Sequence, residues 1–280
     1  EFCIQPNYPF GLNSELIIDA SSSEVTIALV EDKRLVELNK EKKENSFSVG
    51  DIYLGRVKKL MPSLNAAFVD IGYEKDAFLH YLDLGPQVQS LLKFMKTTSS
   101  GSQSESLLNN FEIEPDINKA GKIGQVLSQN MNIMVQIAKE PISTKGPRIT
   151  SELSFAGRFV VLVPFSDIVS VSQKIKSSVE RQRLKRLAQS IKPRNFGIIV
   201  RTVAEGKKVA DLDADIQDLC SRWESLHEML KTAQPPTKIL GEMNRTSTIL
   251  RDLLNPNFNS IQVNDASLAD SHPARDSRFQ

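Results

Sequence analysis

The stretch GDIYLGRVKKLMPSLNAAFVDIGYEKDAFLHYLDLGP, residues 50–86, predicts three short β-strands in succession. Apolar side chains alternate with others in residues 51–60, which is typical of a strand with one buried face. After a break at Pro62, two further apolar runs follow at residues 65–71 and 77–80. Short strands separated by proline and glycine indicate a small β-barrel.

The segments on either side complete the barrel and add further strands. Residues 132–138 alternate again and predict a returning strand that closes the barrel. The segment 97–121 is rich in serine, asparagine and glycine without a regular period, so we expect a flexible insertion there. Upstream, residues 13–40 predict a β-meander, and residues 1–12 predict an irregular extension.

Downstream of the barrel, the pattern predicts both strands and helices. We expect strands at residues 159–164, 196–202 and 259–263, and helices at residues 177–190, 209–232 and 246–254. Ser177 is a suitable N-cap for the first of these helices. The apolar side of that helix is expected to contain Val179, Leu184, Leu187 and Ile191.

The chain has a net charge of only +1, but it contains one strongly basic segment. Residues 174–208 contain eleven lysines and arginines against two acids, Glu180 and Glu205. Such a concentration suggests an anionic partner, and a solvated basic helix is the alternative. The two cysteines exclude a disulfide framework and a multi-cysteine zinc site, and they fit a reducing compartment. Because no apolar run of about 18 residues is present, we expect no membrane-spanning segment.

No catalytic or metal-binding constellation is visible in the sequence. Asp211, Asp213 and Asp215 invite a metal interpretation, but an EF-hand would need glycine in place of Ile216 and glutamate in place of Arg222. The expected role of these aspartates is favourable charge at a helix N-terminus. The three histidines share no ligand spacing. We therefore name no catalytic residue and no metal ligand.

Aromatic residues and a lysine on the expected barrel could bind a base-containing, anionic ligand. Phe68 and Phe78 lie on consecutive expected strands, and Lys139 flanks the same barrel. If exposed, the two rings would stack on bases while the lysine holds a phosphate. The alternative is that both rings belong to the core.

A second candidate set lies in or near the basic segment. Arg201 and Thr202 end an expected strand, where a guanidinium fork and a hydroxyl group can hold a phosphate. The backbone N–H groups of a loop at Gly146 could complete this phosphate site.

Three runs of sequence carry a family resemblance. Besides residues 50–86, they are VQIAKEPISTKGPRITSELSFAGRFVVLVPF at 135–165 and NFGIIVRTVAEGK at 195–207. Together they resemble the ribonuclease E/G family, and are most similar to ribonuclease G-type members of the Bacteroidetes kind. The resemblance covers about residues 13–265.

The resemblance implies an α+β fold, in which an OB-type RNA-binding β-barrel and a 5′-sensor are inserted into a split RNase H-like subdomain. The split subdomain would occupy residues 13–48 and 237–265, the barrel 49–140 and the sensor 141–236. The tail after Asp265, residues 266–280, no longer follows the family pattern.

The resemblance also implies an activity. Members of this family are endoribonucleases that mature ribosomal RNA and turn over messenger RNA in the cytoplasm, as homo-oligomers that use Mg²⁺. They favour single-stranded, AU-rich RNA with a 5′-monophosphate. The residues that match the family's RNA-contacting positions are Phe68, Phe78 and Lys139, and those that match its 5′-phosphate sensor are Arg201 and Thr202.

Two family motifs have no counterpart in these 280 residues. One is the catalytic motif of the form IDxTEALxxIDVNSG, which carries two Mg²⁺-binding aspartates, and the other is the zinc-linking CPxCxGxG motif. We therefore expect an N-terminal, RNA-recognition portion that binds RNA but does not cleave it, with Mg²⁺ belonging to the full-length enzyme. The alternative is a non-catalytic RNA-binding module or the product of a truncated gene.

Overall fold

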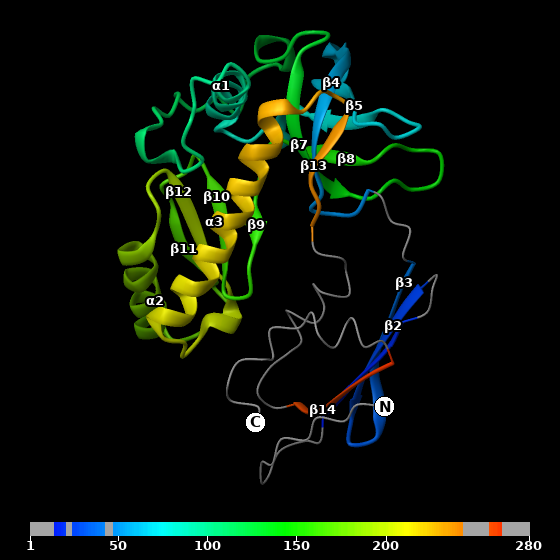
Figure 1. Ribbon diagram of the computed structural model, residues 1–280, viewed down its shortest axis with the longest axis vertical. Helices are drawn as coiled ribbons and strands as arrows, with labels where there is room; N and C mark the ends of the chain where they lie inside the picture. The colour runs from blue at the N-terminus through cyan, green and yellow to red at the C-terminus, as the bar shows by residue number, and fades with distance from the viewer. Residues whose placement is uncertain (1–13, 21–23, 43–46, 243–257, 265–280) are drawn as a thin grey trace. The chain divides into compact units, whose positions relative to one another are not determined.

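The computed structural model describes residues 14–20, 24–42, 47–242 and 258–264 (Figure 1). These residues fall into two compact units. The first contains the described residues up to 42 together with 258–264, and the second runs from Phe47 to Glu242. The extension at 1–12, the helix at 246–254 and the tail at 266–280 lie outside the described residues.

The first unit contains a four-stranded sheet with the strand order β14-β1-β2-β3. Its strands are β1 (Ser14–Ala20), β2 (Glu24–Glu31), β3 (Arg34–Lys42) and β14 (Phe258–Val263). The first three strands are antiparallel neighbours, as the meander pattern predicts. β14 pairs in parallel with β1, so segments from distant parts of the sequence meet in one sheet.

A closed five-stranded barrel forms one part of the second unit. Its strands are β4 (Ile52–Met61), β5 (Ala66–Asp70), β6 (Ala77–His80), β7 (Asn132–Lys139) and β8 (Arg148–Thr150). They follow the order β4-β5-β6-β8-β7, and the pairing of β7 with β4 closes the barrel, which fits the expected OB-type architecture. β8 was not expected from the sequence.

The barrel closes because β4 pairs with different partners along its length. Its first half pairs with β7 and with β13 (Thr237–Leu240), whereas its second half pairs with β5. Gly55 lies at this change of partner, where a Cβ atom would come within 2.7 Å of Val69 and 2.8 Å of the Asp70 carbonyl oxygen. Glycine therefore permits the close approach of β5. β13 belongs to the second unit, although its residues were assigned to the split subdomain.

The other part of the second unit is a four-stranded sheet with helices packed on it. The strands are β9 (Phe155–Ala156), β10 (Val160–Pro164), β11 (Val169–Val171) and β12 (Phe196–Val200). The helices are α1 (Val88–Ser99), α2 (Ser178–Ile191) and α3 (Val209–Thr232). α1 was not expected, whereas α3 has the predicted bounds.

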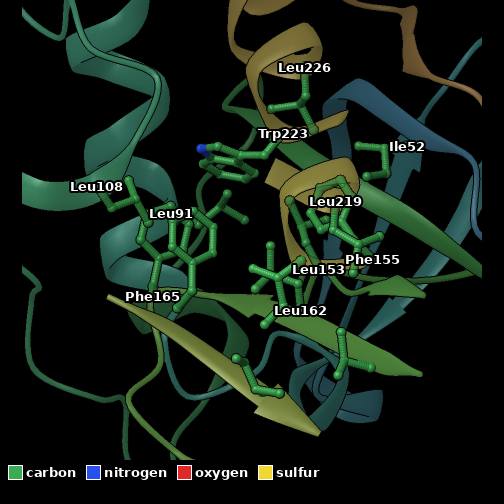
Figure 2. Packing of buried hydrophobic residues seen from close by; sticks show 14 of the residues in the cluster. Ile52, Leu91, Leu108, Leu153, Phe155, Leu162, Phe165, Leu219, Trp223 and Leu226 are labelled. Atoms are coloured by element: carbon green, nitrogen blue, oxygen red, sulfur yellow. The ribbon is translucent and has the colours of Figure 1, made fainter. Parts of the chain in front are cut away.

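Trp223 of α3 lies at the centre of this part, as Figure 2 shows. The indole is fully buried and makes ring contacts with Phe94, Phe155, Phe165 and Phe196. The same cluster includes barrel residues, among them Ile52, Leu54 and Met134. The barrel and the second sheet therefore share one hydrophobic core.

The segment 97–121 is packed against this core, although the sequence predicts a flexible insertion there. Leu108 and Phe111 are buried. The Trp223 Nε1–H donates to the Ser106 carbonyl oxygen at 2.8 Å. Asn195 Nδ2 donates to the carbonyl oxygens of Leu108 and Phe111, each at 2.8 Å. Side chains from elsewhere in the fold thus satisfy the backbone of a segment that has no regular period of its own.

The N-cap prediction for α2 is confirmed, but its predicted apolar side is wrong in part. The Ser177 Oγ accepts the Glu180 N–H at 3.3 Å. Leu184 and Ala188 are the buried residues of this helix, whereas Val179 is 75% exposed. None of the helices in the described part of the chain has the length and apolar character needed to cross a membrane.

Candidate nucleic-acid interface

Phe68 and Phe78 project from the outer surface of the barrel. Along β5, the neighbours of Phe68 are buried, and the same alternation places Phe78 between two buried residues of β6. The two phenylalanines are direct cross-strand partners, with ring centroids 5.8 Å apart in an edge-to-face arrangement. Both rings are partly exposed, and neither is part of the barrel core. This exposure disfavours the alternative that both are core side chains.

Three basic residues on neighbouring strands lie in line with these two rings and form a row across the barrel. Lys59 on β4 lies opposite Phe68, and Arg148 on β8 lies beside Phe78. Lys139 on β7 in turn lies opposite Arg148. We call these five residues the barrel row. All three cations are exposed, so the row has two aromatic rings with positive charge on both sides.

Two β-bulges set the orientation of the lysines in the barrel row. The register shifts between Val57 and Lys59 on β4, and again between Ile137 and Lys139 on β7. Val57 and Ile137 are buried, and two residues further along a regular strand would point to the same buried side. The extra residue at each bulge turns the lysine outward instead.

Gly146 lies in the loop between β7 and β8. A Cβ atom there would come within 2.3 Å of the Asp76 carbonyl oxygen and 2.9 Å of the Lys75 carbonyl oxygen. Because residue 146 is a glycine, this loop can pack against the turn before β6. The two carbonyl oxygens of that turn carry partial negative charge, which disfavours binding of a phosphate next to Gly146. The structure does not bring Gly146 together with Arg201 and Thr202, whose contacts are with the second sheet.

Arg201 and Thr202 lie at the end of β12, and both are partly buried. Arg201 Nη1 donates to the Gly157 carbonyl oxygen at 2.6 Å, and the Arg201 N–H donates to the Phe159 carbonyl oxygen at 2.8 Å. The hydroxyl groups of Thr202 and Ser172 lie 2.9 Å apart. Gly157 and its neighbours, rather than Gly146, are therefore the loop residues beside Arg201.

Asp215 of α3 holds that loop in place. Its carboxylate accepts the backbone N–H groups of Arg158, Phe159 and Val160 at 2.9, 2.7 and 2.9 Å. A Cβ atom at Gly157 would come within 2.5 Å of the same carboxylate. The expected role of Asp215 as charge at a helix N-terminus is therefore wrong, because its side chain is used to anchor a neighbouring loop.

Asp211 and Asp213, the other two aspartates considered as metal ligands, have local partners. Asp211 lies in the first turn of α3, where its negative charge was expected, and it also accepts the Lys208 N–H at 3.0 Å. Asp213 accepts a hydrogen bond from the Gln217 side chain at 2.9 Å. Within the described ranges, no group of three or more His, Cys, Asp and Glu residues is suited to hold a metal ion.

Phe159 adds an aromatic ring next to Arg201. The Arg158 guanidinium carbon lies 5.3 Å from the ring centroid, and the Lys207 Nζ lies 5.6 Å from it. Together with Arg201 and Thr202, these residues form what we call the Arg201 cluster. No sequence pattern singled out Phe159 or Arg158, because their role depends on a loop that Asp215 positions.

A partly exposed ion pair fixes the loop that carries Lys207. Arg183 donates to both carboxylate oxygens of Glu180, at 2.7 and 2.6 Å, and also to the Lys207 carbonyl oxygen at 3.0 Å. Glu180 further accepts the Gly206 N–H at 2.8 Å. The Arg183 hydrogen bonds, followed by the one from Gly206, lower the pKa of Glu180 to about 2. One cation of the basic segment, Arg183, is thus neutralised within the segment itself.

The sequence is similar to a set of ribonucleases. A sequence model described as "Ribonuclease E/G family" matches residues 154–275. Ribonuclease G of Escherichia coli (strain K12) is 32% identical over 252 residues, which is 90% of this chain and 48% of the relative. Ribonuclease E of Synechocystis sp. is 35% identical over 219 residues, or 78% of this chain and 28% of the relative. The chain therefore spans about half the length of the ribonuclease G relatives that it matches.

Proposed function

Because the chain belongs to the ribonuclease E/G family, we propose that it binds single-stranded RNA as the recognition part of an endoribonuclease. The observation that carries this proposal is the barrel row. Bases stack on Phe68 and Phe78, while Lys59 and Lys139 on the flanking strands bind the phosphates. Single strands fit this surface because only unpaired bases present a ring face to an aromatic side chain.

The Arg201 cluster is proposed to bind the 5′-monophosphate of the RNA. A guanidinium forms paired hydrogen bonds with phosphate oxygens, and the Thr202 hydroxyl supplies a further donor. Arg158 and Lys207 add positive charge at the same place. This proposal rests on Arg201 and Thr202 beside the loop at Gly157, and it leaves Gly146 out.

Cleavage itself is not assigned to any described residue. The Mg²⁺ expected of the full-length enzyme would need a group of carboxylates, and Asp211, Asp213 and Asp215 of α3 are engaged in hydrogen bonds within the protein. The described residues do not fit a Mg²⁺ site, because they hold no group of three or more His, Cys, Asp and Glu residues suited to a metal ion. We propose that the purified chain binds RNA without cutting it.

The experiment that tests the main proposal compares Phe68→Ala and Phe78→Ala with the parent chain. Binding of a fluorescent, unstructured RNA oligonucleotide is measured by anisotropy. Each substitution should weaken binding by about 1–3 kcal/mol, the range for loss of one base–aromatic stack. Leu64→Ala is the matched control, because Leu64 is an exposed apolar residue outside the barrel row. Unchanged affinity in both folded phenylalanine variants would refute the proposal.

A further inference from the structure

Arg148 is the residue of the barrel row whose side chain is held in a fixed orientation. It lies between Phe78 and Lys139 in the register of the strands, and 46% of its side chain is exposed. Its Nε and Nη2 donate to the two carboxylate oxygens of Asp83, at 3.0 and 3.1 Å. A guanidinium bound at two points cannot rotate freely, unlike the flexible ammonium groups of the neighbouring lysines.

The backbone around Asp83 is itself fastened to β8. Asp83 ends the short helix η2 (Tyr81–Asp83), which follows β6 directly. Its carbonyl oxygen accepts the Thr150 hydroxyl at 2.7 Å and the Ser151 N–H at 2.9 Å. The two elements that carry Asp83 and Arg148 are therefore joined by backbone bonds as well as by the ion pair.

The ion pair with Asp83 uses two of the three guanidinium nitrogens of Arg148. Within the described residues, the structure records partners for Nε and Nη2 of Arg148 but none for Nη1. Neighbouring strands of a sheet are about 4.8 Å apart, so Arg148 lies one strand spacing from the Phe78 backbone. That separation suits a contact with the phosphate next to a base stacked on Phe78.

We propose that Arg148 binds an RNA phosphate beside Phe78, with Asp83 as the positioning residue that orients the guanidinium. This inference rests on the proposed RNA binding of the barrel row. It assigns the phosphate contact to a pre-oriented side chain, and neither Arg148 nor Asp83 is among the residues that match the family's RNA-contacting positions or its 5′-phosphate sensor. An exposed ion pair contributes little to folding stability, so stability alone gives a weak reason for this pair.

The test measures RNA affinity of the full 280-residue chain as a function of salt concentration. Arg148→Ala should weaken binding about tenfold and lower the slope of log affinity against log salt by about 0.7, the value for one lost phosphate contact on a single strand. Arg148→Lys should keep most of the slope but lose affinity, because lysine cannot form the two-point pair with Asp83.

The decisive variant is Asp83→Asn. If the surface attracts RNA through charge alone, removing a negative charge beside the row should strengthen binding. If Asp83 orients Arg148, Asp83→Asn should instead weaken RNA binding several-fold. Adding Arg148→Ala to the Asp83→Asn variant should then cause little further loss of RNA affinity. Tighter binding by Asp83→Asn, or an unchanged salt slope in Arg148→Ala, would overturn the inference.

Two reference variants separate this inference from the function on which it rests. Lys93→Ala removes a cation that is also ion-paired, to Glu114 at 2.7 Å, but lies on α1 outside the row, and it should bind RNA normally. If Phe78→Ala weakens binding and the Arg148 variants do not, the inference fails and the proposed function stands. If the parent chain does not bind RNA, both fail.

Discussion

At the scale of single residues, Arg201 carries the proposal that the chain reads the 5′ end of RNA. Arg201 follows β12, and its side chain donates a hydrogen bond to the Gly157 carbonyl oxygen. The hydroxyl group of the next residue, Thr202, is hydrogen-bonded to that of Ser172. A phosphate bound here would be recognised by charge and by directed hydrogen bonds.

We predict that Arg201→Ala reduces affinity for 5′-monophosphate RNA about tenfold, the order expected for one charge-assisted contact, with little change for 5′-hydroxyl RNA. The measurement is a pair of anisotropy titrations on otherwise identical oligonucleotides. Lys185→Ala on the exposed side of α2 is the control for loss of one cation in the basic segment. Equal losses for both RNAs would show that Arg201 does not sense the 5′ phosphate.

A second prediction at the residue scale concerns Glu180 and the pH dependence of folding stability. Its pKa falls from 4.5 to about 2, first because Arg183 donates to the carboxylate and then because Gly206 does. A carboxyl group whose pKa is lower in the folded protein stabilises the fold above its unfolded pKa, and that contribution is lost as pH falls through the folded value.

The melting temperature of Glu180→Gln should therefore lie below that of the parent chain at neutral pH. The gap should narrow as pH falls from about 4.5 towards 2, because the parent carboxylate is then protonated and loses the same interaction. Thermal melts of both proteins across this range provide the check. A gap that stays constant with pH would mean that the ionised form of Glu180 does not stabilise the loop.

At the scale of elements, Asn195 shows how an irregular segment is held in place. It lies just before β12 with φ of 64°, and its side-chain amide binds the carbonyl oxygens of Leu108 and Phe111. Asparagine suits both tasks, because it tolerates the left-handed region and carries two N–H donors.

We predict that Asn195→Ala destabilises the protein by about 2–4 kcal/mol, from two lost buried hydrogen bonds and a strained backbone. Asn195→Gly should cost about 1 kcal/mol less, because glycine removes only the strain. Urea unfolding of the three proteins measures both differences. Equal stability of the glycine variant and the parent would show that the two carbonyl contacts do not hold the segment.

At the scale of the whole molecule, the described residues form two units with separate contacts. Both hydrophobic clusters of the described structure, and all residues of the barrel row and the Arg201 cluster, lie within residues 47–242. The parallel pairing of β1 with β14 instead joins residues 14–18 with residues 258–263 in the first unit.

We predict that residues 47–242, produced alone, fold cooperatively and bind RNA with the affinity of the full chain to within about threefold, since no residue of either proposed contact surface is removed. Circular dichroism melts and anisotropy titrations test this. The Phe78→Ala version of the same fragment serves as the control that binding uses the barrel row. A fragment that is unfolded, or folded but unable to bind, would contradict the prediction.

Much of the fold could be predicted from the sequence because it depends on local periodicity. Alternation predicted β4 and β7, short apolar runs predicted β5 and β6, and helical spacing predicted α3 with its observed bounds. The N-cap at Ser177 was also readable, since it depends on neighbours only three residues away. The segment 97–121 was not readable in this way, because distant donors such as Asn195 and Trp223 decide its path.

The candidate site likewise has some features that the sequence predicts and others that only the tertiary structure shows. The sequence by itself determined which aromatic and basic residues are present and the family motifs that contain Phe68, Phe78, Lys139, Arg201 and Thr202. Only the tertiary structure decided that the two rings face outward in one row, because two bulges and the closure of β7 on β4 set the register. The tertiary structure also places Gly157, rather than Gly146, beside Arg201, and it pairs Asp83 with Arg148. Pairings between residues more than 60 positions apart depend on how strands and loops meet, and no local pattern encodes that.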